Sequence, residues 1–212
     1  MANIVIDYKK EYKELYLPKT TPSIVDVPEM QFVAVEGKGS PNDENGEYQR
    51  AIPVLYGIQY AIKMSKKGNH VPDGYFDYVV PPLEGFWWVD KNEDFSFRDK
   101  SKYCWISVIR LPEFVDEKVF AWACEETSKK KKMDVRKAKL LKIKEGLCVQ
   151  CLHVGAYEDE PKTLKLMNDF IDANGFQSDI NEMRRHHEIY LCDPTKTEAS
   201  KLKTVLRIPV KK

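Results

Sequence analysis

One order of predicted elements occurs twice along this 212-residue chain. A strand, a loop containing glycine, a helix with proline near its start and two further strands follow one another in residues 31–111 and again in residues 147–210. Alternating apolar residues indicate the strands, and apolar residues at helical spacing indicate the helices. We therefore predict an α+β fold of two pseudo-symmetric β-α-β-β modules with antiparallel sheets. Related halves commonly enclose a ligand pocket, so we expect a central cleft between them.

The element boundaries follow from hydrophobic periodicity and from proline, glycine and lysine at the ends of helices and strands. The expected strands cover residues 31–36, 75–80, 83–89, 103–111, 140–143, 147–154, 188–192 and 204–210. The expected helices cover residues 47–67, 116–132 and 161–173. The second of these helices has no counterpart in the other half, so we interpret it as an insertion between the modules.

A chain of this length, with 42% hydrophobic residues, supports one sizeable core. We expect a single domain over residues 31–212, preceded by an N-terminal arm over residues 1–30. Pro18, Pro22 and Pro28 interrupt any helix in this arm and favour an extended lead-in. The expected parts of the domain are module one at about 31–112, the inserted helix at about 116–133 and module two at about 139–210.

The charges of the chain almost cancel, because 34 Lys and Arg residues are balanced by 33 Asp and Glu residues. A net charge of +1 provides no overall field for nucleic acid or an anionic membrane, so we expect neither as a direct partner. The N-terminus lacks a sustained apolar run, and the five cysteines form an odd set in apolar segments. Both features indicate a cytoplasmic protein with reduced thiols.

Two short patterns could suggest a metal site, and both are weak. Cys148 and Cys151 have CxxC spacing, but this spacing on a strand sends the thiols to opposite faces. His186, His187 and Glu188 are adjacent on a strand and therefore point apart. We expect neither a metal ion nor a cofactor.

The segment that contains the strand over residues 188–192 supplies one candidate site. Strand alternation puts Glu188 and Tyr190 on one face and His187 on the other. This arrangement is equally consistent with an edge strand in water and with the wall of a pocket. In the loop over residues 153–161, the acidic residues fit helix capping, whereas Tyr157 is placed to enter the cleft.

A second acid lies among aromatic residues in the strand over residues 83–89. Alternation gives Glu84, Phe86 and Trp88 a common face. Three more large aromatic residues follow within a short stretch, and core packing is the simpler interpretation for each tryptophan alone. The candidate ligand-binding residues are Glu84, Phe86, Trp88, Trp105, Phe114, Trp122 and Tyr190.

A carboxylate among aromatic rings is consistent with two functions. It can balance the charge of a lipophilic cation held by cation–π attraction. Alternatively, a buried carboxyl group can act as general acid or base near neutral pH, with a tyrosine donating a hydrogen bond to the leaving oxygen. Both alternatives remain open from the pattern of residues alone.

Four blocks of sequence resemble those of the GyrI-like small-molecule-binding family, in its free-standing form and in the order typical of that family. The blocks are PPLEGFWW at 81–88, HVGAYEDEP at 153–161, HHEIYLCDP at 186–194 and LKTVLRIPV at 202–210. The resemblance covers roughly residues 25–210. It implies two SHS2-type modules and a central cleft for hydrophobic, often cationic, aromatic compounds, with Glu188 at the position that contacts the ligand.

The resemblance implies three functions in order of preference. The first is binding of bulky aromatic or lipophilic molecules in detoxification or drug tolerance. The second is hydrolysis of the cyclopropane ring of DNA-alkylating natural products, with Glu188 and Tyr157 as catalytic residues. The third is inhibition of DNA gyrase, for which we identify no contacting segment. The sensor relatives carry a helix-turn-helix, and residues 1–30 are too short and too rich in proline to form one, which argues against direct transcriptional control.

Overall fold

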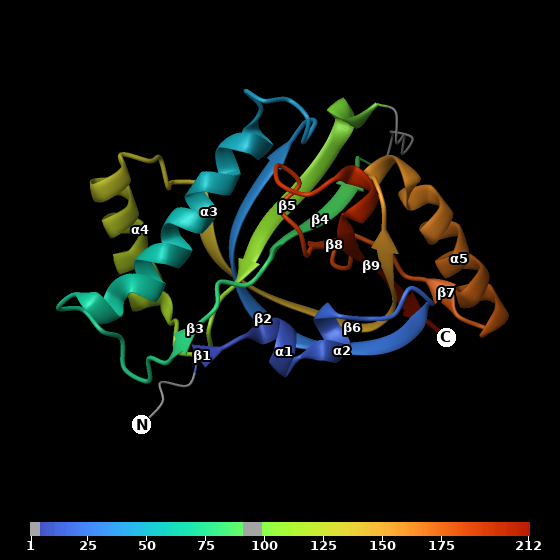
Figure 1. The fold of residues 1–212 in the computed structure, drawn as a ribbon, viewed down its shortest axis with the longest axis horizontal. Coiled ribbons are helices and arrows are strands. Elements are labelled where there is room, and N and C mark those ends of the chain that lie inside the picture. The colour runs from blue at the N-terminus through green and yellow to red at the C-terminus, as the bar shows by residue number, and fades with distance from the viewer. Residues whose placement is uncertain (1–4, 91–98) are drawn as a thin grey trace.

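The computed structural model describes residues 5–90 and 99–212 and is built around a closed ring of strands (Figure 1). Neighbours in the ring follow the order β6-β2-β5-β4-β8-β9, and β9 pairs with β6 again, each pair being antiparallel. Each strand therefore has one face toward the interior of the ring and one toward the helices. The strands are β2 (Ser23–Lys38), β4 (Leu83–Val89), β5 (Tyr103–Arg110), β6 (Ala138–Val154), β8 (His186–Tyr190) and β9 (Lys203–Lys211).

The two predicted modules are present and are arranged symmetrically. Module one contains β2, α3 (Glu47–Met64), β4 and β5, with the sheet order β2-β5-β4. Module two contains β6, α5 (Glu160–Ala173), β8 and β9, with the equivalent order β6-β9-β8. The modules meet where β4 pairs with β8 and again where β2 pairs with β6. The predicted α+β class is confirmed.

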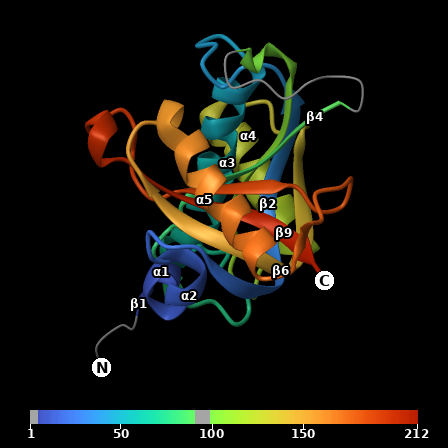
Figure 2. The same cartoon turned by 90° about the vertical axis from the view of Figure 1, so that its right-hand side faces the viewer.

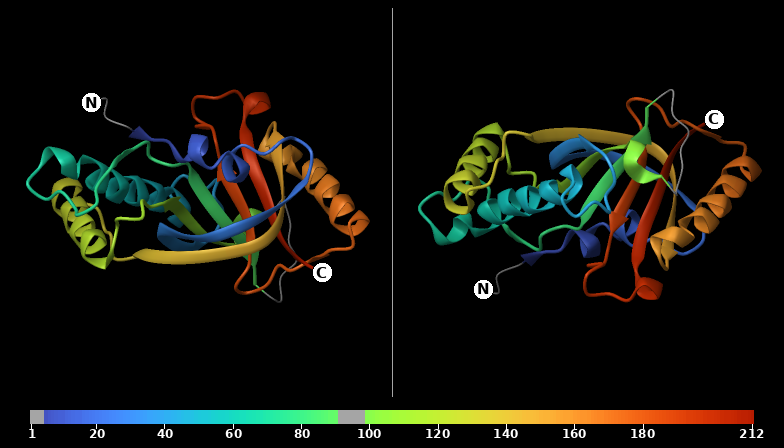
Figure 3. Two further views of the ribbon diagram at one scale, coloured as in Figure 1. Left: turned by 90° about the horizontal axis from the view of Figure 1, so that it is seen from below. Right: turned by 90° about the horizontal axis from the view of Figure 1, so that it is seen from above.

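Helices α3 and α5, one from each module, lie at opposite ends of the molecule (Figures 1 and 3). Helix α5 crosses the strands of module two (Figure 2). The predicted insertion is α4 (Glu117–Lys131), which is capped by Asp116 and packs on α3. A side chain at Gly57 of α3 would lie 2.8 Å from Thr127, so this glycine allows the close approach of the two helices. Within the described residues, no helix combines the length and the apolar character needed to cross a membrane.

Residues 5–30 differ from the extended arm that the prolines suggested. They form β1 (Val5–Ile6), α1 (Tyr8–Glu11), α2 (Lys13–Tyr16) and the first part of β2. Tyr8, Leu15 and Tyr16 are buried in the core. Arg207, inside the ring, donates a hydrogen bond of 2.8 Å to the carbonyl of Leu15. The N-terminal segment is therefore part of the domain, because its apolar side chains and carbonyls complete the interior of the ring.

Two strand predictions need correction. The segment at 75–80 contains only β3 (Asp77–Tyr78), which pairs in parallel with β1 and does not join the ring. The separate strands expected at 140–143 and 147–154 form the continuous β6. Gly146 has φ +64°, a conformation that glycine adopts without strain, so β6 continues through it and pairs with β2 and then β9.

The remaining elements are short. They are the strand β7 (Gln177–Ser178), which pairs with β9, and the 3-10 turns η1 (Ser65–Lys67), η2 (Lys100–Lys102), η3 (Tyr157–Asp159) and η4 (Ala199–Lys201).

The core has two parts, one on each side of the sheet in module two. Cys148 belongs to the large cluster, which includes the interior of the ring and extends under α3, whereas Cys151 packs with Met167 and Leu206 beneath α5. The predicted opposite orientation of the two thiols is confirmed. The residues under α5 define the face of module two that also carries the candidate site.

Candidate functional site

The candidate site lies on the helix side of β8, at the centre of the sheet. Glu188 is in register with Gly85 of β4 and with Leu206 of β9, which packs under α5. Because strand side chains alternate, Tyr190 shares this face and His187 points into the ring. The predicted common face of Glu188 and Tyr190 is therefore present, and it is turned toward the helices.

Polar side chains on both sides of Glu188 hold its carboxylate in place. The hydroxyl of Tyr190 donates a hydrogen bond of 2.8 Å to Oε2 of Glu188, and Nε1 of Trp87 donates one of 2.9 Å to that hydroxyl oxygen. On the other side, Nε2 of His186 lies 3.3 Å from Oε1 of Glu188. The side chain of Glu188 is 16% exposed. The carboxylate is thus held in place by its neighbours yet remains accessible.

Aromatic side chains from five elements, β4, β8, η3, α3 and β5, surround this carboxylate. The ring of Tyr157 in η3 lies edge-on to Tyr190 at 6.1 Å. Tyr48 of α3 and Tyr103 of β5 lie 5.3 and 5.9 Å from Trp87. The two modules and the turn before α5 therefore all contribute to one aromatic enclosure.

A glycine makes room for this arrangement. A Cβ atom at Gly85 would lie 2.6 Å from Nε1 of Trp87 and 3.1 Å from the hydroxyl of Tyr190. Real Cβ atoms do not approach so closely, so a side chain at this position would displace the indole. The glycine in register with Glu188 thus permits the hydrogen bond between Trp87 and Tyr190.

A second carboxyl group, Glu160, begins α5 beside this enclosure. It is 5% exposed, and its Oε1 has no hydrogen-bond partner among the described residues. Burial, followed by the charge of Glu188, raises the pKa of Glu160 to about 9. Glu160 therefore carries a proton at neutral pH and can donate it.

The phenols of the enclosure also keep their protons. Burial, followed by the charges of Glu160 and Glu188, raises the pKa of Tyr157 to about 12. Burial and Glu188 likewise raise the pKa of Tyr48 and of Tyr190 well above the ordinary value. At physiological pH these hydroxyls are hydrogen-bond donors around the two carboxyl groups.

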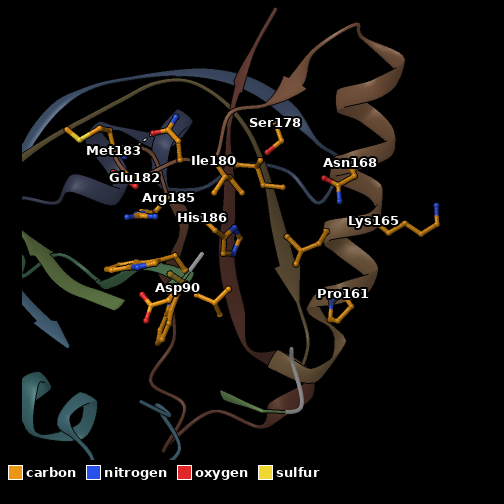
Figure 4. A pocket seen from close by; sticks show the side chains of 16 residues that line it. Asp90, Pro161, Lys165, Asn168, Ser178, Ile180, Glu182, Met183, Arg185 and His186 are labelled. Atoms are coloured by element: carbon orange, nitrogen blue, oxygen red, sulfur yellow. Dashed lines mark hydrogen bonds between the residues drawn. The ribbon is translucent and has the colours of Figure 1, made fainter. Parts of the chain in front are cut away.

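A groove of about 1130 Å³ leads to this site (Figure 4). It runs between α5 and the segment from Ile180 to His186, past the end of β4. Trp87 and His186, both beside Glu188, line the groove, as does Pro161, which follows Glu160. The volume suits a bulky small molecule, and Glu188 and Glu160 lie behind these lining residues rather than on the groove wall itself. Within the described residues, no group of three or more His, Cys, Asp or Glu side chains is positioned to hold a metal ion.

Glu84 and Phe86 are not in this site. They share a face as predicted, but that face points into the ring. Glu84 is completely buried and accepts a hydrogen bond of 3.3 Å from Tyr16, and Phe86 stacks on His187 with ring centroids 4.0 Å apart. Alternation groups the residues of a strand by face, whereas tertiary packing decides which face is interior.

The other predicted aromatic residues separate into different regions. Trp88, at the end of β4, lines the groove. Trp105 is 1% exposed and packs edge-on to Tyr48 at 5.1 Å, so it supports the enclosure from behind. Phe114 packs with Tyr75, Phe76 and Tyr78 elsewhere, and Trp122 on α4 stacks on His70. Phe114 and Trp122 therefore pack against residues of module one.

Four residues of the enclosure were missing from the sequence prediction. They are Tyr48, Trp87, Tyr103 and Glu160. Trp87 alternates with Gly85 and so shares its face, which would have revealed it once β4 was paired with β8. Glu160 was interpreted as a helix cap, but the cap position of α5 is Asp159 and Glu160 turns into the protein.

The sequence matches the GyrI-like small molecule binding domain over residues 20–211. Solved structures from Listeria innocua are similar over nearly the whole chain. An uncharacterized conserved protein is 47% identical with a TM-score of 0.92, covering 97% of this chain and 100% of that one. A protein described as a hydrolase is 46% identical with a TM-score of 0.90, covering 98% of this chain and 100% of that one.

The C-terminal domain of EcmrR shares the fold at 12% identity, with a TM-score of 0.52 over 91% of this chain and 98% of that one. No curated protein sequence matches the chain. The family match spans far more than half of the chain and agrees with the paired modules. The chain belongs to the family of GyrI-like small-molecule-binding domains.

Proposed function

We propose that this protein binds a bulky aromatic small molecule in the groove and hydrolyses it beside Glu188. The observation that carries the proposal is the pairing of Glu188 with Glu160, whose pKa is raised to about 9. A carboxylate that accepts hydrogen bonds and a carboxylic acid that keeps its proton are the two partners required for general acid–base catalysis. The similarity to a Listeria innocua protein described as a hydrolase, at 46% identity, gives further support.

The proposed substrate is a DNA-alkylating compound whose cyclopropane ring is conjugated with a carbonyl group. Glu188 takes a proton from water as the water oxygen forms a bond to a ring carbon. The strained carbon–carbon bond breaks, and its electron pair moves into the conjugated carbonyl, which receives the proton of Glu160. One water molecule is added in total, and proton transfer from Glu188 to Glu160 restores the starting state. Tyr157 donates a hydrogen bond to the developing oxygen.

The test is to follow ring opening of such a compound by chromatography. Glu188→Gln keeps the size of the side chain but removes the base, and we expect product formation to slow by about 10²–10⁴-fold with binding nearly unchanged. Tyr157→Phe should cause a smaller loss. Glu125→Gln, an exposed glutamate of α4, is the control and should react like the wild type. Equal rates in wild type and Glu188→Gln would remove Glu188 from the mechanism.

A second candidate is sequestration of a lipophilic cation without reaction. The aromatic rings of Trp87 and Tyr190 beside the carboxylate of Glu188 favour it, since rings and an acid together stabilise a desolvated positive charge. The fluorescence anisotropy of a rhodamine dye tests this function. Glu188→Gln should then weaken the binding of cations far more than that of neutral compounds of the same shape. Absence of ring opening in the wild type, together with such charge-dependent binding, would replace hydrolysis by sequestration. Either activity would protect a cell from toxic aromatic compounds.

A further inference from the structure

The outer part of the groove contains a pair of side chains, Trp88 and Arg185, that the proposed chemistry does not use. Both line the groove. Arg185 lies on the side opposite α5 (Figure 4). The guanidinium carbon of Arg185 lies 4.4 Å from the centroid of the Trp88 ring. This contact orients the guanidinium as a charged surface on the wall of a largely apolar groove.

Two of the other charges along the groove are balanced by ion pairs. Asp90 lies 2.6 Å from Lys38, and Lys165 lies 2.8 Å from Asp169. Glu182 also has an interaction partner. Arg185, by contrast, has no carboxylate within ion-pair distance among the described residues. Arg185 therefore brings a positive charge to the groove whose contact, among the described residues, is a ring rather than a carboxylate.

The stacked guanidinium also has unused hydrogen-bonding capacity. A guanidinium carries five N–H donors in its plane, and stacking on an aromatic ring leaves these donors available. Among the described residues, none accepts a hydrogen bond from Arg185. The neighbouring groove residues Ile180, Met183 and Leu164 are apolar. A ligand that completes this environment has a flat apolar body and an oxygen acceptor at its edge.

We propose that Trp88 and Arg185 form a subsite for a planar aromatic group that bears an oxygen acceptor, with a carboxylate as the strongest case. Trp88 contacts the ring, and Arg185 donates hydrogen bonds to the oxygen. This subsite therefore prefers anionic aromatic ligands to neutral ones and disfavours cations, which argues against the sequestration of a cation as the function of the groove. The subsite rests on the proposed function only in that both use the same groove. Its ligand binding can be measured without turnover of any substrate.

Three pyrene derivatives of nearly equal shape test the preference for charge. They are pyrene-1-carboxylate, 1-pyrenemethanol and 1-pyrenemethylammonium, and their binding is measured by fluorescence anisotropy at low ionic strength. We expect the wild type to bind the carboxylate about 10-fold more tightly than the alcohol, and the ammonium most weakly. A preference for the ammonium, or no binding of any probe at about 100 μM, would overturn the subsite.

Substitutions assign the preference to Arg185. Arg185→Ala should weaken binding of the carboxylate probe about 10-fold, so that its affinity equals that of the alcohol. Arg185→Gln provides a second variant that retains a polar side chain. Arg185→Lys should recover only part of the preference, because it keeps the charge but loses the planar donors. Lys165→Ala, which removes an equal charge from the same groove, is the control and should change each affinity by less than about 2-fold.

Failure of the subsite can be distinguished from failure of hydrolysis. Glu188→Gln and Glu160→Gln should keep the preference for the carboxylate, since neither residue touches this part of the groove. If folded Arg185→Ala binds all three probes as the wild type does, the subsite is refuted whatever the result of the ring-opening assay.

Discussion

The proton of Glu160 is the property of the site that pH can test directly. Its pKa is raised to about 9 by burial and by the charge of Glu188. A general acid works only while it is protonated, so the rate of hydrolysis should remain high at neutral pH and fall as the pH rises through about 9. The measurement is kcat/KM between pH 6 and pH 10 with a cyclopropane-bearing substrate.

Replacement of Glu160 identifies the group responsible for this alkaline decline. Glu160→Gln keeps the shape and a donor group but cannot transfer a proton, so kcat should fall by about 10²-fold and the decline near pH 9 should disappear. Glu125→Gln, an exposed glutamate of α4, should retain the wild-type profile. An unchanged decline in Glu160→Gln would assign it to another group.

Two tryptophans provide a contrast between binding and stability. Trp88 lines the groove, whereas Trp105 is fully buried behind Tyr48. We expect Trp88→Ala to weaken ligand binding by about 1–3 kcal/mol while the fold survives. Trp105→Ala should instead lower the free energy of unfolding by about 3–5 kcal/mol, because it leaves a large cavity. Urea unfolding and ligand titration of both variants measure the difference, and a reversed pattern would contradict these placements.

At the scale of elements, the pairing of β4 with β8 depends on a residue without a side chain. Gly85→Ala would place a Cβ atom 2.6 Å from Nε1 of Trp87, so the indole must move and its hydrogen bond to Tyr190 is lost. We expect a loss of about 1–3 kcal/mol in stability and weaker ligand binding. Near-ultraviolet circular dichroism should report the displaced indole.

A second glycine supplies the control for this substitution. A Cβ atom at Gly68 would lie 3.7 Å from the nearest atom, the carbonyl oxygen of Ser65, which is an ordinary contact. Gly68→Ala should therefore leave both the spectrum and the affinity unchanged. If Gly85→Ala behaves in the same way, the close packing of Trp87 against β8 is not required.

At the scale of the whole molecule, a buried ionic cluster joins the N-terminal segment to both modules. His187 lies 3.0 Å from a carboxylate oxygen of Glu84 in module one and 3.0 Å from one of Glu145 in module two. The contact with Glu84 is an ion-pair distance whose angle does not suit a hydrogen bond. Arg207 contacts Glu145 at 2.8 Å and donates to the carbonyl of Leu15.

This cluster should make the fold sensitive to acid. Burial alone would raise the pKa of Glu145, but the charges of His187 and Arg207 outweigh it and lower the pKa to about 2. Because the folded pKa is below the ordinary value of 4.5, the stabilisation is present above pH 4.5 and is lost as the pH falls toward 2. Urea unfolding between pH 6 and pH 2.5 should show this loss.

Removal of the charge on Glu145 tests its share of the acid sensitivity. Glu145→Gln should lower the free energy of unfolding at pH 7 by about 3–5 kcal/mol, because Arg207 and His187 lose their partner in the interior. The free energy of unfolding of this variant should also depend less on pH below pH 4.5. Glu158→Gln, on the surface, should alter neither quantity. An acid profile in Glu145→Gln that matches the wild type would place the sensitivity elsewhere.

The sequence alone determined the elements and their repeat, because both depend on local periodicity. The strand at 83–89 was predicted with the observed limits, and the long helices were predicted to within a few residues. It also determined that Glu188 and Tyr190 share a face, since alternation along a strand is a local property. The family followed from four short blocks of residues that surround the same strands.

Only the tertiary structure decided which face of each strand meets a ligand. Glu84 and Glu188 are both acids beside aromatic residues, yet the first is enclosed in the ring and the second lies on the helix side, in contact with His186, which lines the groove. The closing of the ring and the burial of Tyr8, Leu15 and Tyr16 depend on contacts between residues far apart in the chain. Glu160 acquires its role in the same way, because its raised pKa arises from burial and from the charge of Glu188, which lies 28 positions later in the sequence.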